Sequence, residues 1–275
     1  MQKYSIEIVP KQIERLKYLP RDVFTEVYVA YIPGDKYENI VEASRRLIKN
    51  GFNVIPHCPA RTIPSKKELD SYLSQLSSIG VKKILTLAGS GKNHFEPTEN
   101  PKNLFNNTLE MLETGLFEKY QFEQINIAGH PEGNPMDPES EKNLQLKCHW
   151  LNQHNFNFSI VTQWTTNLKS TNKWILDTKE MIKSKFAKKI SITIGVAGPA
   201  KLTTLINYAK ICGVNATALI IKNKKLGLRN LLTHNPTEII DGLRNHDNLH
   251  IFPFGGIKEV RNWFDEKEKS KCQIL

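Results

Sequence analysis

Acid–base residues stand within or at the ends of several short apolar runs. Glu7 is flanked by Ile6 and Ile8, and a carboxylic acid that apolar neighbours desolvate has a raised pKa. Such a group holds a proton near neutral pH and can donate it as a general acid. His57 and Gln163 end two further runs, where an imidazole and an amide can orient a polar ligand. These residue types predict proton-transfer chemistry with Glu7 as the catalytic acid.

Two other apolar runs end in glycine-rich or polar loops. Residues 89–92 read Gly-Ser-Gly-Lys, and their backbone N–H groups suit a phosphate, although the spacing is not that of a P-loop. His130 and Glu132 follow another run. Together with His57 they match no metal-ligand spacing, so no metal site is predicted. Each residue alone has an ordinary structural explanation, and it is their recurrence at equivalent positions that indicates a ligand site.

Eight short β-rich runs alternate with longer amphipathic segments, as in a parallel α/β fold. Residues 84–88 and 190–194 are almost entirely apolar, which is typical of strands buried on both faces. Eight such strands without an intervening linker favour a closed (β/α)8 TIM barrel, whose active site lies at the C-terminal ends of the strands. The predicted strands are Tyr4–Val9, Glu26–Ile32, Asn53–His57, Lys83–Ala88, Gln124–Gly129, Asn157–Gln163, Ser191–Val196 and Leu249–Phe254.

The segments between these strands have helical periodicity. Ser65, followed three residues later by Glu68, forms a capping box ahead of one of them. The predicted helices cover residues 37–50, 65–78, 139–153, 172–186, 199–211, 230–243 and 257–264. We expect one domain over residues 1–275, with a frayed C-terminal tail over residues 266–275.

The composition is ordinary for a soluble protein but carries an excess of positive charge. The net charge is +10, which suits an anionic ligand such as a dinucleotide or a polyglutamylated folate. No apolar run is long enough for a membrane span, and the N-terminus lacks the apolar core of a signal peptide. No nucleic-acid-binding motif accompanies the charge, so no nucleic-acid partner is predicted. Four cysteines without a CxxC pair favour a reduced, cytoplasmic chain.

Several of these strings resemble motifs of the methylenetetrahydrofolate reductase family. Ala-Gly-His-Pro-Glu-Gly-Asn-Pro at 128–135 resembles its Ala-x-Tyr-Pro-Glu-x-His-Pro signature. Leu-x-x-Lys at 144–147 and Ile-Val-Thr-Gln at 160–163 resemble its downstream motifs. Ser-Ile-Glu-Ile-Val-Pro at 5–10 and Val-Ile-Pro-His at 54–57 resemble its first and third strand ends. The matches are short, and they run in the family's order from residue 5 to about residue 260.

The resemblance implies a TIM barrel that interconverts 5,10-methylenetetrahydrofolate and 5-methyltetrahydrofolate with NAD(P)H, using FAD as a hydride relay. It implies that Glu7 protonates N10 of the folate, and that Gln163 and Ser90 contact the folate. The positions that it assigns to the cofactor are His57, Gly89, His130, Glu132 and Lys147.

This sequence departs from the family at the flavin positions. Ala88 and Ser90 stand where the family has Arg and Asp, and His130 and Asn134 replace its Tyr and His. These changes remove charges from the flavin site, so flavin is expected to bind weakly or not at all, with NAD(P)H delivering hydride directly. A folate-binding or methyl-transfer barrel without redox activity is the alternative. The direction of the reaction and a homo-oligomeric state are left open.

Overall fold

Eight parallel strands form the centre of the molecule, as the sequence predicts. The computed structural model describes residues 4–32, 34–89, 105–135, 137–212, 214 and 233–272. Each predicted strand is confirmed to within a few residues at its ends. The strands are β1 (Tyr4–Ile8), β2 (Phe24–Val29), β3 (Asn53–Pro59), β4 (Lys83–Leu87), β5 (Gln124–Gly129), β6 (Phe158–Trp164), β7 (Ile192–Ala197) and β10 (Asn248–Phe252).

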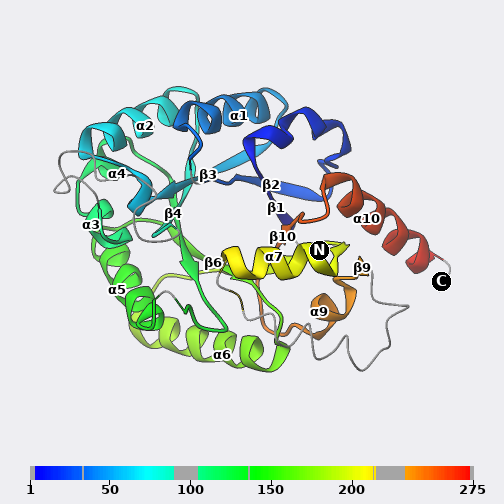
Figure 1. Cartoon of the computed structure of the whole chain (residues 1–275). Helices are drawn as coiled ribbons and strands as arrows, with labels where there is room; N and C mark the ends of the chain where they lie inside the picture. The colour runs from blue at the N-terminus through cyan, green and yellow to red at the C-terminus, as the bar shows by residue number, and fades with distance from the viewer. Residues whose placement is uncertain are drawn as a thin grey trace.

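The sheet closes on itself into a barrel. The strand order is β1-β10-β7-β6-β5-β4-β3-β2, and β1 pairs in parallel with both β2 and β10. Figure 1 looks into the barrel, with helices around it. The prediction of a single-domain (β/α)8 TIM barrel is therefore confirmed. Because all eight strands run the same way, their C-terminal ends meet at one end, which we call the mouth; the opposite end is the base.

Helices surround the barrel on its outer side (Figure 1). Ser65 caps α2 as predicted, because its hydroxyl accepts a hydrogen bond of 3.1 Å from the Glu68 backbone N–H. A 3-10 helix, η1 (Pro10–Tyr18), and a short one, η2 (Ala60–Thr62), were not predicted. The surrounding helices are α1 (Tyr37–Lys49), α2 (Lys66–Ser78), α3 (Thr108–Leu112), α4 (Leu116–Lys119), α5 (Ser140–Gln153), α6 (Leu168–Lys185), α9 (Thr237–Gly242) and α10 (Ile257–Cys272).

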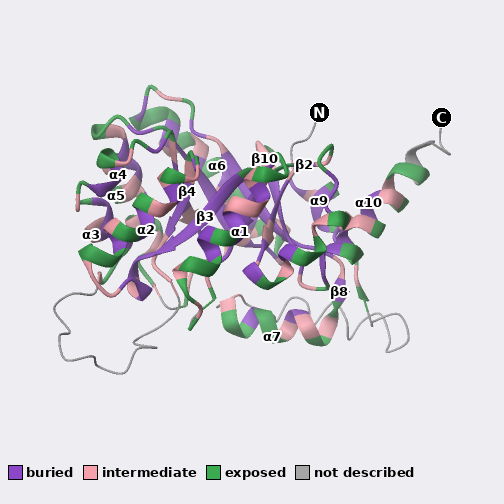
Figure 2. Ribbon diagram, turned by 90° about the horizontal axis from the view of Figure 1, so that it is seen from above, coloured by how far each residue is buried: buried purple, intermediate pink, exposed green. Residues whose placement is uncertain are grey.

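The side chains of each strand alternate between the helix layer and the barrel interior. Ile6 and Ile8 are buried in the main apolar core, between the strands and the helices. Glu7 lies between Ile6 and Ile8 in the sequence, and Ser5 precedes Ile6, so both belong to the face of β1 that points into the barrel interior. The interior itself is partly polar: Asn126 Nδ2 donates to the Tyr28 hydroxyl at 2.8 Å. Figure 2 shows the buried strands inside and the mixed exposure of the helices outside.

Helix α7 (Leu202–Cys212) does not belong to the surrounding ring, where the sequence placed it. Figures 1 and 2 together show it lying across one end of the barrel. Its buried Leu205 and Ala209 pack against Trp164 and Phe252, which lie at the ends of β6 and β10. Helix α7 therefore covers the mouth. A two-stranded antiparallel sheet of β8 (Ala200–Lys201) and β9 (Thr233–His234) follows β7, and α9 takes the outer position.

Three helix boundaries also differ from the prediction. Helix α9 begins at Thr237 rather than at residue 230, because Thr233 and His234 pair with β8 as β9. Helix α6 begins at Leu168, four residues early, because the Asn167 side chain accepts hydrogen bonds from the Lys169 and Ser170 backbone N–H groups. Helix α10 continues to Cys272, so the prediction of a frayed tail from residue 266 is wrong for residues 266–272. Across the described ranges, none of the helices combines the length and the apolar character needed to cross a membrane.

Candidate functional site

Three predicted site residues lie towards the mouth on three different strands. Glu7 is next to last in β1, His57 lies in the C-terminal half of β3, and Gln163 is next to last in β6. Alternation along each strand places them on the barrel's inner face, near its C-terminal end. In a TIM barrel this is the end that carries the active site.

Glu7 lies between two histidines. His57 Nε2 is 3.1 Å from Glu7 Oε2, and His250 Nε2, from β10, is 3.6 Å from the same oxygen. The Glu7 side chain keeps 20% of its surface exposed, whereas His250 keeps 1%. His57 is held in turn through its backbone, whose carbonyl accepts a 2.8 Å hydrogen bond from the Tyr72 hydroxyl. This Glu7–His57–His250 cluster is the most concentrated set of acid–base groups at the mouth.

The cluster corrects the expected acidity of Glu7. Burial alone raises the pKa of a carboxyl group, as the sequence analysis assumed. Here the positive charge and N–H groups of His57 and His250 outweigh burial and lower the pKa of Glu7 to about 2. Glu7 is therefore a carboxylate at neutral pH. The expectation of a raised pKa is wrong because two basic groups, distant in sequence, converge on the side chain.

A β-bulge positions Gln163. The pairing of β6 with β7 shifts by one residue between Val161 and Trp164, which re-aims the side chains beyond it. Gly195 permits the close approach of β7, since a Cβ there would lie 2.6 Å from the Thr162 carbonyl oxygen. The Gln163 side chain accepts a 3.0 Å hydrogen bond from the Trp164 backbone N–H. Within the described residues its amide nitrogen has no such partner, so it is available to a ligand.

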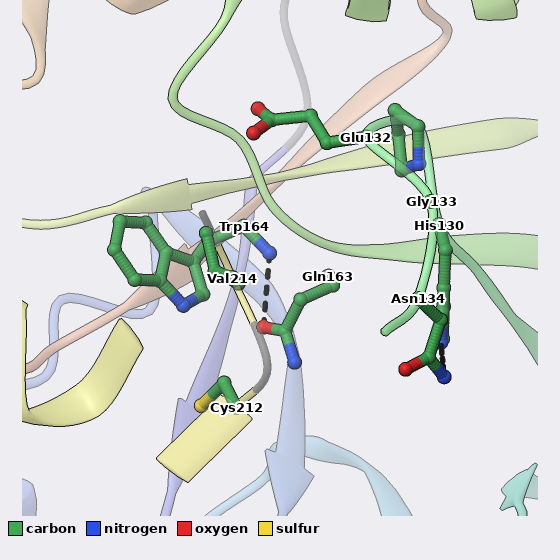
Figure 3. A pocket seen from close by; sticks show the side chains of 9 residues that line it. His130, Glu132, Gly133, Asn134, Gln163, Trp164, Cys212 and Val214 are labelled. Atoms are coloured by element: carbon green, nitrogen blue, oxygen red, sulfur yellow. Dashed lines mark hydrogen bonds between the residues drawn. The ribbon is translucent and has the colours of Figure 1, made fainter. Parts of the chain in front are cut away.

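A small pocket of about 20 Å³ brings Gln163 together with the strand-5 loop and the end of α7 (Figure 3). His130 accepts a 3.2 Å hydrogen bond at Nε2 from the Asn134 side-chain amide. Burial, assisted by the charge of Lys147, lowers the pKa of His130 to about 4, so the ring is neutral at pH 7. The pocket residues are His130, Pro131, Glu132, Gly133, Asn134, Gln163, Trp164, Cys212 and Val214.

Cys212 connects this pocket with the Glu7 cluster. It lines the pocket beside Gln163. Burial, and then the nearby charge of Glu7, raise the pKa of its thiol to about 11. Glu7 and Gln163 both lie at the C-terminal ends of their strands, next to last in β1 and β6. One mouth therefore holds both groups of predicted site residues.

Glu132 holds the loop after β6 in place. Its carboxylate accepts hydrogen bonds from the Thr165 hydroxyl at 2.7 Å, the Thr166 hydroxyl at 2.8 Å and the Asn167 backbone N–H at 2.8 Å. Figure 3 shows the carboxylate turned away from Gln163. Both oxygens thus hold the start of α6 in place, which gives Glu132 a positioning role; its contact with a cofactor stays a prediction.

Lys147 and Gly89 also have structural partners. Lys147 Nζ lies 3.5 Å from the Ala128 carbonyl oxygen, and burial lowers the pKa of its ammonium group to about 8. Gly89 has a φ of +85°, and a Cβ there would lie 3.2 Å from Pro59, so the turn after β4 requires glycine. Ser90 lies outside the described residues.

These contacts do not fit a flavin at the positions that the family resemblance assigns. The Glu132 carboxylate accepts four hydrogen bonds from residues 165–167, His57 faces Glu7, and His130 is neutral and bonded to Asn134. Among the residues with described positions, no group of three or more His, Cys, Asp or Glu side chains is arranged to hold a metal ion. The mouth therefore offers proton chemistry and amide recognition from the protein's own side chains.

Three residues of the mouth were not among the predicted site residues: His250, Trp164 and Cys212. His250 alternates with Leu249 and Ile251, both fully buried, so a polar residue among apolar neighbours marked an inward position of β10. Trp164 follows Gln163, and only the bulge brings both to the mouth. Nothing in the sequence marked Cys212 as a site residue, because α7 was expected to lie in the outer ring of helices.

No family model matches the chain. Among solved structures it is similar to an uncharacterised protein from Clostridium thermocellum that binds two copies of 5-methyl-5,6,7,8-tetrahydrofolic acid: the TM-score is 0.60, with 9% identity, covering 98% of this chain and 95% of that one. It is also similar to dihydropteroate synthase from Thermus thermophilus, with a TM-score of 0.51 and 8% identity, covering 98% and 94%. At such identities the likeness establishes the fold.

Proposed function

We propose that this chain binds a reduced folate at the mouth and interconverts 5,10-methylenetetrahydrofolate and 5-methyltetrahydrofolate with NAD(P)H. The motifs similar to those of methylenetetrahydrofolate reductases support the reaction. The Clostridium thermocellum barrel, whose ligand is 5-methyltetrahydrofolic acid, supports the ligand class. The single observation that carries the proposal is the Glu7 carboxylate held between His57 and His250 at the mouth.

The reductive step begins with a proton on the Glu7–His57 pair. The proton passes from His57 Nε2 to Glu7 Oε2, which are 3.1 Å apart, and from there to N10 of the folate. The bond between N10 and the methylene carbon then breaks, N10 keeps the electron pair, and a 5-iminium cation forms. The Glu7 carboxylate, negative again, stabilises this cation electrostatically. NAD(P)H, when bound, supplies the hydride that reduces the iminium carbon to a methyl group.

Ligand binding requires α7 to move. The mouth pocket holds about 20 Å³, whereas sites for ligands of drug size hold roughly 300–1,000 Å³. Trp164 lines this pocket, and Leu205 and Ala209 of α7 pack on Trp164. We infer that α7 withdraws when the folate enters and closes behind it, which excludes water from the iminium cation.

A folate-binding barrel without redox chemistry is the second candidate. The lowered pKa of Glu7, about 2, favours it, because a resting carboxylate suits recognition of a cationic or N–H-bearing pterin. We place either function in the cytoplasm, because the described cysteines Cys58, Cys148 and Cys212 are free thiols.

Replacing Glu7 by glutamine separates the two candidates. If the chain is an oxidoreductase, Glu7→Gln lowers turnover of NAD(P)H with 5,10-methylenetetrahydrofolate by about a hundredfold or more, since an amide cannot transfer the proton. Folate still binds, because Gln keeps the size and polarity of Glu. Glu14→Gln, a change of the same type on the exposed surface, is the control.

Turnover that survives in Glu7→Gln contradicts the role of Glu7 as the acid. Absence of turnover in the unchanged protein, together with tight folate binding, supports the non-redox candidate. Stoichiometric flavin absorbance in the purified protein contradicts direct hydride transfer from NAD(P)H.

A further inference from the structure

Polar side chains occupy the barrel interior between its two ends: Ser5 and His250 are hydrogen-bonded, and His250 lies close to Glu7 but beyond hydrogen-bond distance of it. Ser5 Oγ lies 2.9 Å from His250 Nδ1, and the other ring nitrogen, His250 Nε2, lies 3.6 Å from Glu7 Oε2. Ser5 and His250 are 4% and 1% exposed, so bulk water does not intervene between them. The order Ser5, His250, Glu7 therefore runs from the base towards the mouth.

The lower end of this chain opens into a polar cavity of about 290 Å³ at the base. Nearly all of its lining residues come from the first residues of the strands, and Ser5 is one of them. Thr25 and Asn53 at its rim are exposed, so the cavity reaches solvent. Its polar lining and volume suit several water molecules. The lining residues are Tyr4, Ser5, Thr25, Glu26, Tyr28, Asn53, Lys83, Gln124, Ser159, Ser191, Thr193 and Asn248.

The groups between the cavity and Glu7 can each pass a proton on. A hydroxyl both donates and accepts, and an imidazole can take a proton at one nitrogen while it releases one at the other. The Ser5 hydroxyl has two acceptors within reach: His250 Nδ1, and the Leu249 carbonyl oxygen at 3.4 Å. It can therefore donate to the ring in one state and accept from the ring in the other.

We propose that Ser5 and His250 form a proton relay between the polar cavity at the base and Glu7 at the mouth. The relay runs when the His250 ring is neutral, with its proton on Nε2 and Nδ1 free to accept. In one step, Ser5 gives its proton to His250 Nδ1, His250 Nε2 gives its proton to Glu7 Oε2, and a water of the cavity restores the proton of Ser5. The hydroxide left in the cavity is neutralised by solvent, so one proton has moved from solvent to Glu7. The reverse sequence removes a proton from Glu7.

A relay from the base is useful because α7 covers the mouth. Helix α7 packs over the upper end, and the pocket beneath it has about 20 Å³. With α7 in this position, the Glu7 side chain keeps 20% of its surface exposed, so solvent water reaches it from above by a restricted route. The relay restores the protonation state of the Glu7 cluster from the opposite end of the barrel. This inference does not depend on the identity of the substrate.

The surroundings of His250 contain few competing proton carriers. The Tyr28 ring lies edge-on, with its centroid 4.6 Å from that of His250, and burial raises the pKa of its phenol well above the usual range. Phe252 packs on another side of the ring at 4.8 Å. Glu7 itself faces His57 and influences Cys212. In the cavity, Glu26 is paired with Lys83 at 2.6 Å.

Nuclear magnetic resonance of protein labelled with ¹⁵N-histidine tests the relay. The measurement is the rate at which the His250 ring N–H exchanges with solvent. Ser5→Ala is expected to slow this exchange by about tenfold or more, because the nearest proton carrier is gone. Ser5→Cys is expected to slow it as well, since a thiol is a weaker hydrogen-bond donor. Ser5→Thr keeps the hydroxyl and is expected to exchange like the unchanged protein.

Ser191→Ala is the matched control, because Ser191 lines the same cavity but forms no described contact with His250. It is expected to leave the exchange rate unchanged. Equal exchange rates in Ser5→Ala, Ser5→Cys and the unchanged protein would overturn the relay. Since no folate is present, this outcome is separate from the fate of the proposed reaction.

Discussion

Glu7 shows how three side chains set each other's charge. A carboxylate at a barrel mouth among apolar neighbours would hold its proton. With His57 and His250 within 3.6 Å, the negative form is favoured instead. The protein thereby keeps a carboxylate and a transferable proton side by side, and either can face a ligand. In the proposed reaction, the acid is the Glu7–His57 pair rather than Glu7 alone.

His130 leads to a pH prediction of its own. Its pKa falls from 6.5 to about 4 on folding, so the unfolded chain takes up a proton first as the pH drops. The free energy of unfolding is therefore expected to fall by about 3 kcal/mol between pH 6.5 and pH 4 from this group alone. Chemical denaturation across this range measures it. His130→Gln is expected to remove this part of the pH dependence, while replacement of the exposed His149 leaves it intact.

Glu7 contributes in a lower pH window. Its pKa is about 2 in the folded chain, against an ordinary value of 4.5, so its stabilising effect is present above pH 4.5 and is lost as the pH falls towards 2. The two windows are separable. A His130→Gln protein that still loses stability between pH 6.5 and pH 4 as the unchanged protein does would contradict the buried, neutral state of His130.

At the residue scale, the sequence predicted where the site residues lie better than it predicted their protonation states. Glu7, His57 and Gln163 lie near the mouth as expected, because strand ends can be located from apolar runs. The charge of Glu7 was mispredicted because His250 is 243 residues away in the chain, and only barrel closure pairs β1 with β10. Ser5 received no role for the same reason.

The start of α6 depends on a residue from another loop. Glu132 accepts hydrogen bonds from Thr165, Thr166 and Asn167, directly before the first turn of the helix. A carboxylate beside a helix N-terminus also stabilises the positive end of the helix dipole. This arrangement ties the loop after β5, which carries His130, to the loop after β6, which follows Gln163.

Removing the Glu132 carboxylate therefore tests how the start of α6 is stabilised, rather than the strength of one hydrogen bond. Glu132→Ala is expected to lower the free energy of unfolding by about 3 kcal/mol, because the buried Thr165 hydroxyl and the donors of Thr166 and Asn167 all lose their acceptor. Urea denaturation measures this loss. Glu139→Ala, which removes an exposed carboxylate paired with Lys142, is the control and is expected to change stability by less than about 1 kcal/mol. Equal losses would contradict the assigned role.

The strands were predictable because burial on both faces leaves a continuous apolar run. The positions of the helices around the barrel were less predictable. Helix α7 has ordinary helical spacing, and nothing in residues 202–212 distinguishes packing over the mouth from packing in the ring. Its position follows from what it contacts: Leu205 and Ala209 meet Trp164, which the β6 bulge turns towards the mouth. Tertiary contacts of this kind have no local sequence signal.

As a whole, the molecule divides its polar groups between the two ends of one barrel. The mouth carries Glu7, His57, Gln163 and the covering helix α7. The base carries a larger polar cavity and the Glu26–Lys83 ion pair. Parallel strands impose this division, since all C-terminal ends face one way. The net charge of +10 suits an anionic folate but does not indicate which end binds it.

Calorimetric titration with 5-methyltetrahydrofolate tests most directly the claim that the mouth is a folate site. Two glutamines, one at each end, give a matched pair: Gln163 at the mouth and Gln124 at the base. We predict that the unchanged protein binds the folate, that Gln163→Ala weakens binding by about tenfold through the loss of one pterin hydrogen bond, and that Gln124→Ala binds normally. Two results would contradict the account. One is that the unchanged protein does not bind the folate. The other is that Gln163→Ala binds it as tightly as the unchanged protein does, and only Gln124→Ala binds it more weakly.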